Sequence, residues 1–198
     1  MLDPETADPD PIAEFGRWLA DAFASGIQNA DACAVATAAA DGRPSVRFVL
    51  CKGADARGFV FYTNTESRKA GELAENAHAA LAFYWTGLGR QVRVTGHVEP
   101  VSRGEAEAYF RSRPLGSQVG AWASPQSRPI GSRDELESLV AEITERFRAA
   151  EPPLPPHWGG YRVVPREIEL WEHRDDRLHD RVLYTRAENG WRRERLAP

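Results

Sequence analysis

Residues 32–63, ACAVATAAADGRPSVRFVLCKGADARGFVFYT, decide the fold class of this chain. Apolar and polar side chains alternate from residue 45 to residue 52, which is typical of a strand with one buried face. The alternation places Val46, Phe48 and Leu50 on one face and Arg47, Val49 and Cys51 on the other. The Asp41-Gly42 pair suits a hairpin turn. The stretch therefore predicts three consecutive antiparallel strands, at residues 32–39, 45–52 and 58–63.

Outward from this stretch, the chain continues in short elements joined mainly by turns. Further strands are predicted at residues 78–85, 90–99, 161–164, 167–172, 181–185 and 191–196. Helices are predicted at residues 11–25, 67–75, 102–112 and 133–149. The segment 113–132 contains three prolines and is predicted to be mostly loop, with one helical turn. This order favours a mainly β fold with flanking helices, and an antiparallel barrel rather than a βαβ sheet.

The composition is that of one globular domain. Of the 198 residues, 42% are hydrophobic and 27% are charged, close to the average of globular proteins. The acidic, proline-rich residues 1–10 are predicted to be a disordered lead, and residues 11–198 a single domain. A net charge of −4 argues against a general nucleic-acid surface. The sequence shows neither an apolar run of ~18 residues nor a signal peptide, so no membrane span is expected and cytoplasm is the default location.

Several common reaction motifs are absent from the sequence. It contains neither a GxxxxGK[ST] phosphate loop nor a GxSxG nucleophile elbow. Gly87 and Gly89 begin a GxG, but a strand is predicted where a dinucleotide-binding turn needs a helix. The five histidines are scattered, so no metal site is predicted. Cys33 and Cys51 form neither a CxxC pair nor a disulfide framework.

Two polar clusters lie in the first half of the chain. Arg47 and Lys52 end an apolar strand, and a period of two aims them at opposite faces. The alternative is a strand with a solvated face and a basic end. The second cluster runs from Tyr62-Thr63-Asn64 to Ser67-Arg68-Lys69, where a helix begins. Its free N–H groups and cations suit an anion, although capping by Ser67 beside two exposed bases explains the pattern equally well.

Two further clusters lie in the second half. Tyr109, Arg113 and Ser117 are a common mix for gripping a phosphate monoester, and the alternative is a helix end whose arginines complement the helix dipole. Arg177 and His179 alternate with Arg181, so in an extended chain the three share one face. Such groups repel one another unless an anion lies among them, which favours a ligand over a solvated face.

Together, the four clusters supply positive groups for two phosphates but no obvious nucleophile. Only two of the 25 basic residues are lysines, Lys52 and Lys69, and both lie in these clusters. The alternative is that two lysines remain there by chance. A protein that binds without attacking suggests that a cofactor carries the chemistry.

The same clusters belong to runs that carry a family resemblance. The runs are RFVLCK (47–52), FYTNTESRKAGELAEN (61–76), RQVRVTGHVE (90–99), YFRSRPLGSQVGAWASPQS (109–127), PPHWGGYRVVPREIELW (155–171), RLHDR (177–181) and RLAP (195–198). With them the sequence resembles the pyridoxamine 5′-phosphate oxidase family, from about Phe15 to Pro198. The resemblance implies a split β-barrel homodimer that binds FMN in each of two grooves at the subunit interface.

The resemblance also implies site residues, position by position. The FMN site is expected to contain Arg47, Phe48, Val49, Leu50, Cys51, Lys52, Tyr62, Thr63, Arg68, Lys69, Gln91, Gln126, Ser127, Trp171 and Arg181, with Arg68 and Lys69 on the FMN phosphate. The substrate phosphate is expected on Lys52, Tyr109, Arg113 and Ser117. Arg177 and His179 are expected to flank the substrate ring as the catalytic pair, with Arg177 positioning the reacting centre.

The implied activity is oxidation of pyridoxamine or pyridoxine 5′-phosphate to pyridoxal 5′-phosphate, a step of vitamin B6 biosynthesis and salvage. In this family a hydride passes from the substrate 4′-carbon to flavin N5, and O2 reoxidises the flavin to give H2O2. The amine substrate also releases NH3. Two alternatives are a related split-barrel flavoprotein acting on another ring, such as a phenazine precursor, and a flavin or pyridoxal phosphate carrier without turnover.

Two features of the chain depart from the family pattern. Many relatives carry a longer basic N-terminal segment that closes over the substrate, whereas the lead here is short and acidic. Weaker substrate binding is therefore expected. Cys51 replaces the aliphatic residue that is usual before Lys52. Its expected role is packing, and it is also expected to be sensitive to oxidation because it would lie near the flavin.

Overall fold

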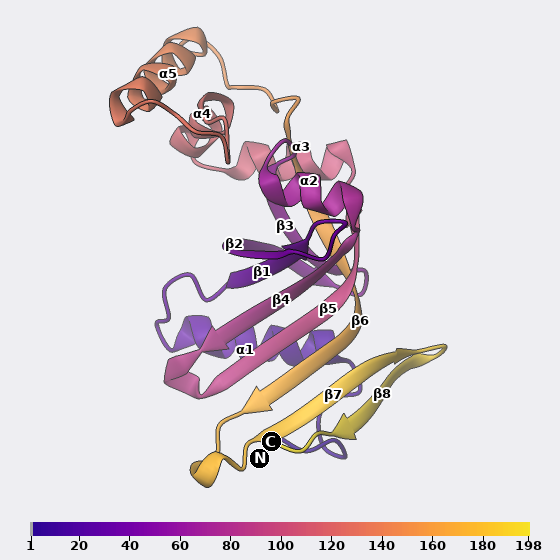
Figure 1. Ribbon diagram of the computed structural model, residues 1–198. Coiled ribbons are helices and arrows are strands. Elements are labelled where there is room, and N and C mark those ends of the chain that lie inside the picture. Colours follow the sequence, from indigo (N-terminus) through magenta and orange to yellow (C-terminus); the bar gives the residue numbers. More distant parts are fainter. Residues whose placement is uncertain (1) are drawn as a thin grey trace.

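The computed structural model describes residues 2–198 and contains one antiparallel sheet (Figure 1). Its strands are β1 (Ala32–Ala38), β2 (Pro44–Asp55), β3 (Gly58–Asn64), β4 (His78–Trp85), β5 (Arg90–Pro100), β6 (Trp158–Glu172), β7 (Asp180–Ala187) and β8 (Gly190–Arg195). They follow the order β3-β2-β1-β4-β5-β6-β7-β8, and a further pairing of β3 with β6 closes the first six into a barrel. The predicted mainly β barrel is confirmed. Met1, the first residue of the predicted lead, lies outside the described residues.

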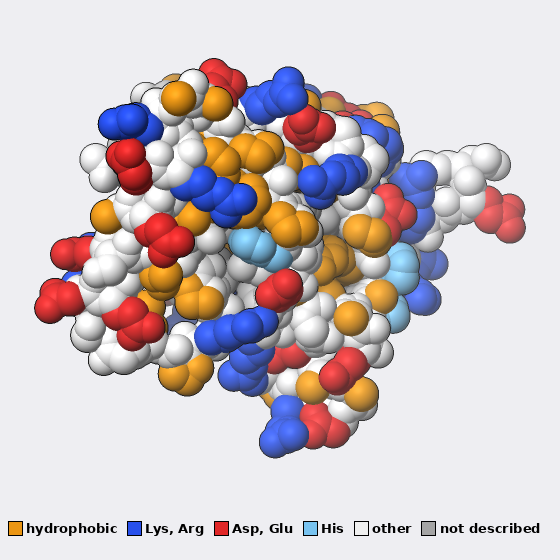
Figure 2. Space-filling model, turned by 90° about the horizontal axis from the view of Figure 1, so that it is seen from above, with side chains coloured by type: hydrophobic (Ala, Val, Ile, Leu, Met, Phe, Trp, Pro, Cys, Tyr) orange, Lys and Arg blue, Asp and Glu red, His pale blue; other side chains and the backbone are white. Residues whose placement is uncertain are grey.

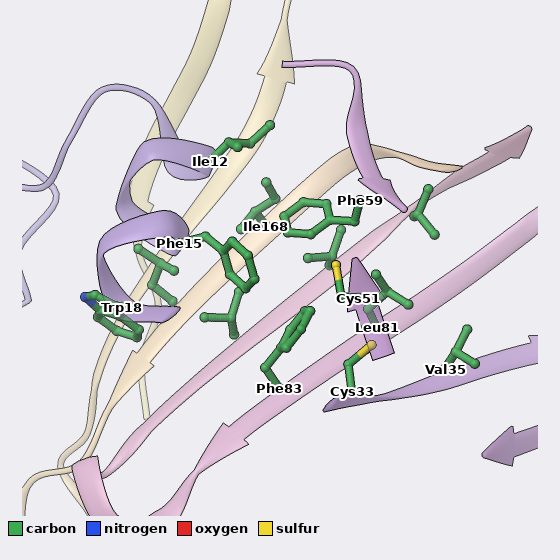
Figure 3. Packing of buried hydrophobic residues seen from close by; sticks show 14 of the residues in the cluster. Ile12, Phe15, Trp18, Cys33, Val35, Cys51, Phe59, Leu81, Phe83 and Ile168 are labelled. Atoms are coloured by element: carbon green, nitrogen blue, oxygen red, sulfur yellow. The ribbon is translucent and has the colours of Figure 1, made fainter. Parts of the chain in front are cut away.

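Helix α1 (Pro11–Ala24) closes the core of this barrel. Asp10 caps the helix by accepting a hydrogen bond from the Ile12 N–H at 2.9 Å. The Phe15 ring packs 5.0 Å from that of Phe59 and 4.8 Å from that of Phe83 (Figure 3). Because these rings come from α1, β3 and β4, a single aromatic cluster joins the helix to two sides of the barrel.

Strand β6 is longer than predicted, because it runs through Pro165. The sequence predicts two separate strands, at 161–164 and 167–172. In the structure, Gly96 of β5 pairs with Pro165 while Thr95 pairs with Glu167, so Arg166 is an extra residue in a bulge. A Cβ on Gly96 would lie 2.1 Å from the Val164 carbonyl oxygen, so only glycine allows this approach.

The N-terminal residues pack on the β7–β8 hairpin, and both chain ends lie there (Figure 1). The Tyr184 hydroxyl donates to the Asp8 carbonyl oxygen at 2.9 Å, and the Arg193 guanidinium donates to that of Ala7 at 2.5 Å. Leu2 is buried. The sequence predicts a disordered lead, whereas residues 2–10 make these defined contacts. The donors, Tyr184 and Arg193, lie about 180 residues further along the chain, so the composition of residues 1–10 alone does not indicate these contacts.

The remaining helices gather at one end of the barrel (Figure 1). They are α2 (Arg68–Glu75), α3 (Arg103–Ser112), α4 (Leu115–Ala123) and α5 (Arg133–Arg146). The sequence predicts only one helical turn between residues 113 and 132, but α4 occupies nine residues there. Pro114 stands at its N-cap, where the missing N–H breaks no helical hydrogen bond. The three prolines led to the prediction of a loop, but Pro114 stands where a helix begins and does not interrupt one.

Candidate active site

A cavity of about 820 Å³ opens beside β2, β3 and the starts and ends of helices α2, α3 and α4. Seen from this end of the molecule, basic and acidic side chains are interspersed around an apolar surface (Figure 2). Most of the predicted site residues line the cavity: Arg47, Phe48, Val49, Leu50, Lys52, Tyr62, Thr63, Arg68, Lys69, Tyr109, Arg113, Ser117, Gln126 and Ser127. Ser45, Val46, Ser112, Pro114 and Trp158 also line it and were not predicted. Three of the four predicted clusters therefore meet in one place.

Two positively charged binding sites, here called cationic seats, lie in this cavity. The first contains Lys69 with Arg47 and Arg68. The buried Lys69 ammonium donates to Thr63 Oγ1 and Gln126 Oε1, both at 2.8 Å, and to Ser67 Oγ at 3.1 Å. Burial, together with the nearby charge of Arg47, lowers the pKa of Lys69 to about 8. Ser67 holds the N-cap position of α2 but makes no capping hydrogen bond. The Ser67 hydroxyl therefore serves the lysine, which favours the anion seat over ordinary capping.

Glu72 holds Arg47 and Arg68 in this seat, a role that was not predicted from the sequence. Its carboxylate accepts hydrogen bonds from Thr37 Oγ1 and Ser45 Oγ, both at 2.5 Å. It also accepts from Arg68 Nε at 2.8 Å and Arg47 Nη2 at 3.2 Å. Burial alone would raise the pKa of Glu72, but these four donors outweigh burial and hold the pKa at about 2. Glu72 thus stays ionised and fixes both guanidinium groups at the cavity wall.

Lys52 and Arg47 both line the cavity, and so do residues from both faces of β2, so the prediction that the two cations point to opposite faces stays a prediction. The pairing of β2 with β3 shifts register between Cys51 and Gly53, and this irregularity breaks the strict alternation. The Lys52 ammonium lies 2.5 Å from Asp31 Oδ2. The lysine is therefore held by a carboxylate that lies just before β1.

Cys51 does not line the cavity. Its side chain is buried in the barrel core, where its thiol donates to the Gly53 carbonyl oxygen at 3.3 Å (Figure 3). Burial raises the pKa of Cys51 to about 11, so the reactive thiolate is scarce at neutral pH. The core position supports the packing role and not the expected sensitivity to oxidation.

Arg113 forms a second cationic seat across the cavity. Its guanidinium lies 4.9 Å from the centre of the Trp158 ring, and Tyr109 stacks on Tyr62 with ring centres 4.0 Å apart. The Nη1 atom of Arg113 is buried and has no hydrogen-bond partner among the described residues. Burial lowers the pKa of Arg113. A desolvated donor without a partner is costly, so this nitrogen is well suited to an anionic ligand.

The other predicted residues lie elsewhere in this chain. Gln91 pairs with Trp171, which pairs with Arg181, at the end of the barrel away from α2 and α3 (Figure 1). The His179 ring lies 4.5 Å from that of Trp171. We refer to these residues as the C-terminal cluster: Gln91, Trp171, Arg177, His179 and Arg181.

Arg177 is not part of a strand, which corrects the prediction that it shares a strand face with His179 and Arg181. Asp176 and Arg177 have φ values of 55° and 62°, and β7 begins only at Asp180. The prediction extended a strand alternation across a tight turn. Arg177 therefore lies in a left-handed turn between β6 and β7.

The fold and the cavity define a class of protein: a split-barrel protein with a cavity lined by basic side chains. The family described as pyridoxamine 5′-phosphate oxidase matches residues 19–147. A second match, to the pyridoxine 5′-phosphate oxidase C-terminal dimerisation region, covers residues 158–198. The chain belongs to the pyridoxamine 5′-phosphate oxidase family of flavoprotein oxidoreductases, which confirms the resemblance seen in the sequence.

Named relatives and solved structures agree with this family. The pyridoxine/pyridoxamine 5′-phosphate oxidase of Rubrobacter xylanophilus is 56% identical over 97% of this chain and 88% of its own. That of Burkholderia vietnamiensis is 54% identical over 100% of this chain and 93% of its own. PhzG from Burkholderia lata, solved with tetrahydrophenazine-1-carboxylic acid, superimposes with a TM-score of 0.93 at 34% identity, covering 100% of this chain and 98% of that one.

Membrane-spanning helices and clustered metal ligands are both absent from the described residues, 2–198. No helix in this part of the chain is long and apolar enough to cross a membrane. No group of three or more His, Cys, Asp or Glu side chains there is arranged to hold a metal ion.

Proposed function

We propose that this chain is an FMN-dependent oxidase that converts pyridoxamine and pyridoxine 5′-phosphate to pyridoxal 5′-phosphate. O2 is the electron acceptor, H2O2 is a product, and the amine substrate also yields NH3. One observation carries the proposal: a single cavity contains two separate cationic seats, around Lys69 and around Arg113. Two phosphoesters, one on the cofactor and one on the substrate, need such a pair of seats.

The residues of the first seat fit the phosphate of FMN. Lys69 is buried and already surrounded by hydroxyl and amide groups, while Arg68 stands beside the N-terminus of α2 with its guanidinium held by Glu72. Helix N-termini and basic side chains both favour phosphate. Arg47, Lys52, Tyr62, Gln126 and Ser127 extend along the wall where the rest of the cofactor would lie. Bound FMN would supply the hydride acceptor for the substrate carbon that becomes the aldehyde.

The residues of the second seat fit the substrate phosphate. Arg113 offers a buried donor without a partner, and Tyr109 and Ser117 add hydroxyl groups to the same wall. The backbone at this point is fixed, because Gln118 Nε2 donates to the Arg113 carbonyl oxygen at 2.9 Å. The guanidinium itself lies over the Trp158 ring, so both backbone and side chain are positioned before the ligand arrives, which lowers the entropic cost of binding.

The C-terminal cluster fits a homodimer with FMN at the interface. Within one chain this cluster lies at the other end of the barrel from the cavity, so the site it would complete belongs to a second copy (Figure 1). The matched C-terminal dimerisation region contains all of its members except Gln91. Beside the cavity, Phe48 and Val46 are 77% and 66% exposed, which is an apolar strip that a second copy would cover. Arg177 and His179 of one copy would then flank the substrate held by the other.

The similarity to PhzG raises a second candidate, a split-barrel flavoprotein acting on another ring. Such an enzyme would keep the first seat but has no need of the phosphate grip of Tyr109, Arg113 and Ser117. All three residues line the cavity here, which favours a phosphorylated substrate. A carrier without turnover would bind the same ligands but make no peroxide.

The proposed function is tested by the colour of the protein. The purified protein should show a yellow flavin spectrum, and pyridoxamine 5′-phosphate added under anaerobic conditions should bleach it. Admitting O2 should restore the yellow colour with release of H2O2. A colourless protein that does not bind added FMN contradicts the cofactor. A yellow protein that pyridoxamine phosphate leaves unbleached contradicts the substrate and points to the carrier or to another ring.

FMN affinity should fall as pH rises above about 8, because Lys69 binds phosphate only when protonated. Its pKa is about 8 in the ligand-free protein, and a bound phosphate raises that pKa. The affinity should be constant below this pH and then fall by up to ~10-fold per pH unit above it. Fluorescence titration of FMN between pH 7 and pH 10 measures this. In the Lys69→Arg variant the residue stays charged over this range, so the FMN affinity of the variant should not change with pH. The same slope in both proteins would remove Lys69 from the phosphate site.

A further inference from the structure

The turn that carries Arg177 and His179 is conformationally unfavourable and needs support. Asp176 and Arg177 are consecutive non-glycine residues with φ values of 55° and 62°. Side chains crowd the backbone in this left-handed region, so such residues persist only where the surroundings hold them. Arg177 and Leu178 are exposed, so burial of the tip of the turn does not provide that support.

A chain of ion pairs at the base of the turn supports its left-handed conformation. Arg174 Nε lies 2.7 Å from Asp180 Oδ2, and Arg174 Nη2 lies 2.8 Å from Glu172 Oε2. Glu172 ends β6 and Asp180 begins β7, so one guanidinium ties the two ends of the turn together. Planar guanidinium groups suit such a double contact, and a lysine ammonium does not reproduce it.

The network continues beyond the turn to the N-terminal residues. Asp180 Oδ1 lies 3.1 Å from Arg195 Nη1, and Arg195 Nη2 lies 2.5 Å from Asp3 Oδ2. The Asp180 side chain is only 13% exposed, whereas those of Arg174 and Arg195 are 37% and 46% exposed, so the two contacts are partly shielded from water. Coulombic attraction is stronger where water is excluded. The base of the turn is thus fixed to β8 and to the start of the chain.

Arg174 also acts on His179 through its backbone. The Arg174 N–H donates to His179 Nδ1 at 3.2 Å, and a backbone N–H can only donate. Nδ1 therefore carries no proton, and in the neutral ring the proton lies on Nε2. This hydrogen bond sets the tautomer of His179 and leaves Nε2–H as the donor, which suits ligand binding and not proton abstraction. An alanine at position 174 would keep the same backbone N–H, so the Arg174 side chain influences this hydrogen bond only through the ion pair with Asp180 that holds the turn in shape.

We propose that Arg174, through its pair with Asp180, is a positioning residue that sets the orientation of Arg177 and the tautomer of His179. The inference rests on the proposed function, in which these two side chains flank the substrate ring. The substrate phosphate would be held elsewhere, by the seat around Arg113. Loss of Arg174 should therefore slow the chemical step while leaving substrate affinity nearly unchanged.

The test compares holoenzymes of the wild type, Arg174→Ala, Arg174→Lys and Arg192→Ala. Arg192 is a matched control, because it pairs with Glu194 at 3.0 Å on β8, in an exposed part of the neighbouring β7–β8 hairpin. In stopped-flow reduction by pyridoxamine phosphate, Arg174→Ala should lower the limiting rate on the order of 10- to 100-fold with a substrate Kd within a few-fold. Arg174→Lys should be intermediate, and Arg192→Ala should match the wild type.

A second readout does not depend on turnover. The ¹⁵N spectrum of His179 should show an unprotonated Nδ1 in the wild type and in Arg192→Ala, and exchange between tautomers in Arg174→Ala. An unchanged His179 spectrum in Arg174→Ala overturns the proposal. So does a loss of rate that merely follows a loss of flavin or of melting temperature. If pyridoxamine phosphate fails to reduce even the wild type, the proposed function is wrong, while the nitrogen spectra still decide the role of Arg174.

If Arg174→Ala does not fold, Asp180→Asn removes the other half of the pair without changing the size of the side chain. It should give the same rate loss and the same change in the His179 spectrum. Wild-type values for both in Asp180→Asn overturn the proposal.

Discussion

Replacing Arg113 with alanine is expected to raise the Michaelis constant for pyridoxamine 5′-phosphate by about 10- to 150-fold. The magnitude is that of one charged hydrogen bond, ~1.5–3 kcal/mol. The reason lies in the buried Nη1 of Arg113, which lacks a protein partner among the described residues. A ligand phosphate would be its natural acceptor. Steady-state kinetics over a wide range of substrate concentrations measures the change.

The same substitution should not weaken the ligand-free protein. Arg113 is partly desolvated and has no ionic partner among the described residues, so its removal relieves a cost that only its contacts with the Trp158 and Phe110 rings offset. The melting temperature of the variant without substrate should equal or exceed that of the wild type. Its flavin content should be unchanged, because the first seat contains other residues.

Arg111→Ala is the matched control for this prediction. Arg111 lies in the last turn of α3, two residues before Arg113, where it is 70% exposed and pairs with Glu107 at 2.6 Å on the solvent side. Exposed pairs of this kind contribute little. Its Michaelis constant should therefore stay near that of the wild type. An unchanged constant in Arg113→Ala, or an equal rise in both variants, would remove Arg113 from the phosphate site.

Local periodicity was enough to predict most of the barrel. The strands at 78–85 and 90–99 were predicted nearly to the residue, and along the second of them Val92, Val94 and Val98 alternate with polar side chains. The helix from Arg103 was also predicted, since Ser102 and Glu105 mark its start and the Ser102 hydroxyl does accept from the Glu105 N–H. These signals lie within a few residues of one another.

Contacts between distant segments could not be predicted in this way. Glu72 looked like an ordinary helix carboxylate, yet it joins Arg47 and Thr37, which precede it by 25 and 35 residues. The same holds for Asp31, the partner of Lys52. The resemblance indicated which residues share the site. The resemblance did not indicate which site residues lie together within one chain, since their positions depend on the closure of the barrel.

Heterodimers should show that the active site is shared between two copies. In one heterodimer, an Arg113→Ala protomer pairs with an Arg177→Ala protomer. If each site takes Arg113 from one copy and Arg177 from the other, one site carries both substitutions and the other carries neither. The heterodimer should then have about half of the wild-type turnover, while both parent homodimers are strongly impaired. Tandem affinity tags isolate the mixed species, and kcat/KM per dimer measures the recovery.

The decisive control places both substitutions on the same protomer and pairs it with a wild-type protomer. In a shared arrangement each of its two sites lacks one arginine, so this heterodimer should be nearly inactive. If each chain instead builds its own complete site, the two results exchange: the first heterodimer is inactive and the second retains half of the activity. The structure favours the shared arrangement, because the cavity lined by Arg113 lies at one end of the barrel and the turn with Arg177 at the other (Figure 1). Flavin should remain bound to both parent homodimers, since neither substitution touches Lys69 or Arg68. Loss of flavin from the Arg177→Ala homodimer would assign that residue to the cofactor and not to the substrate ring.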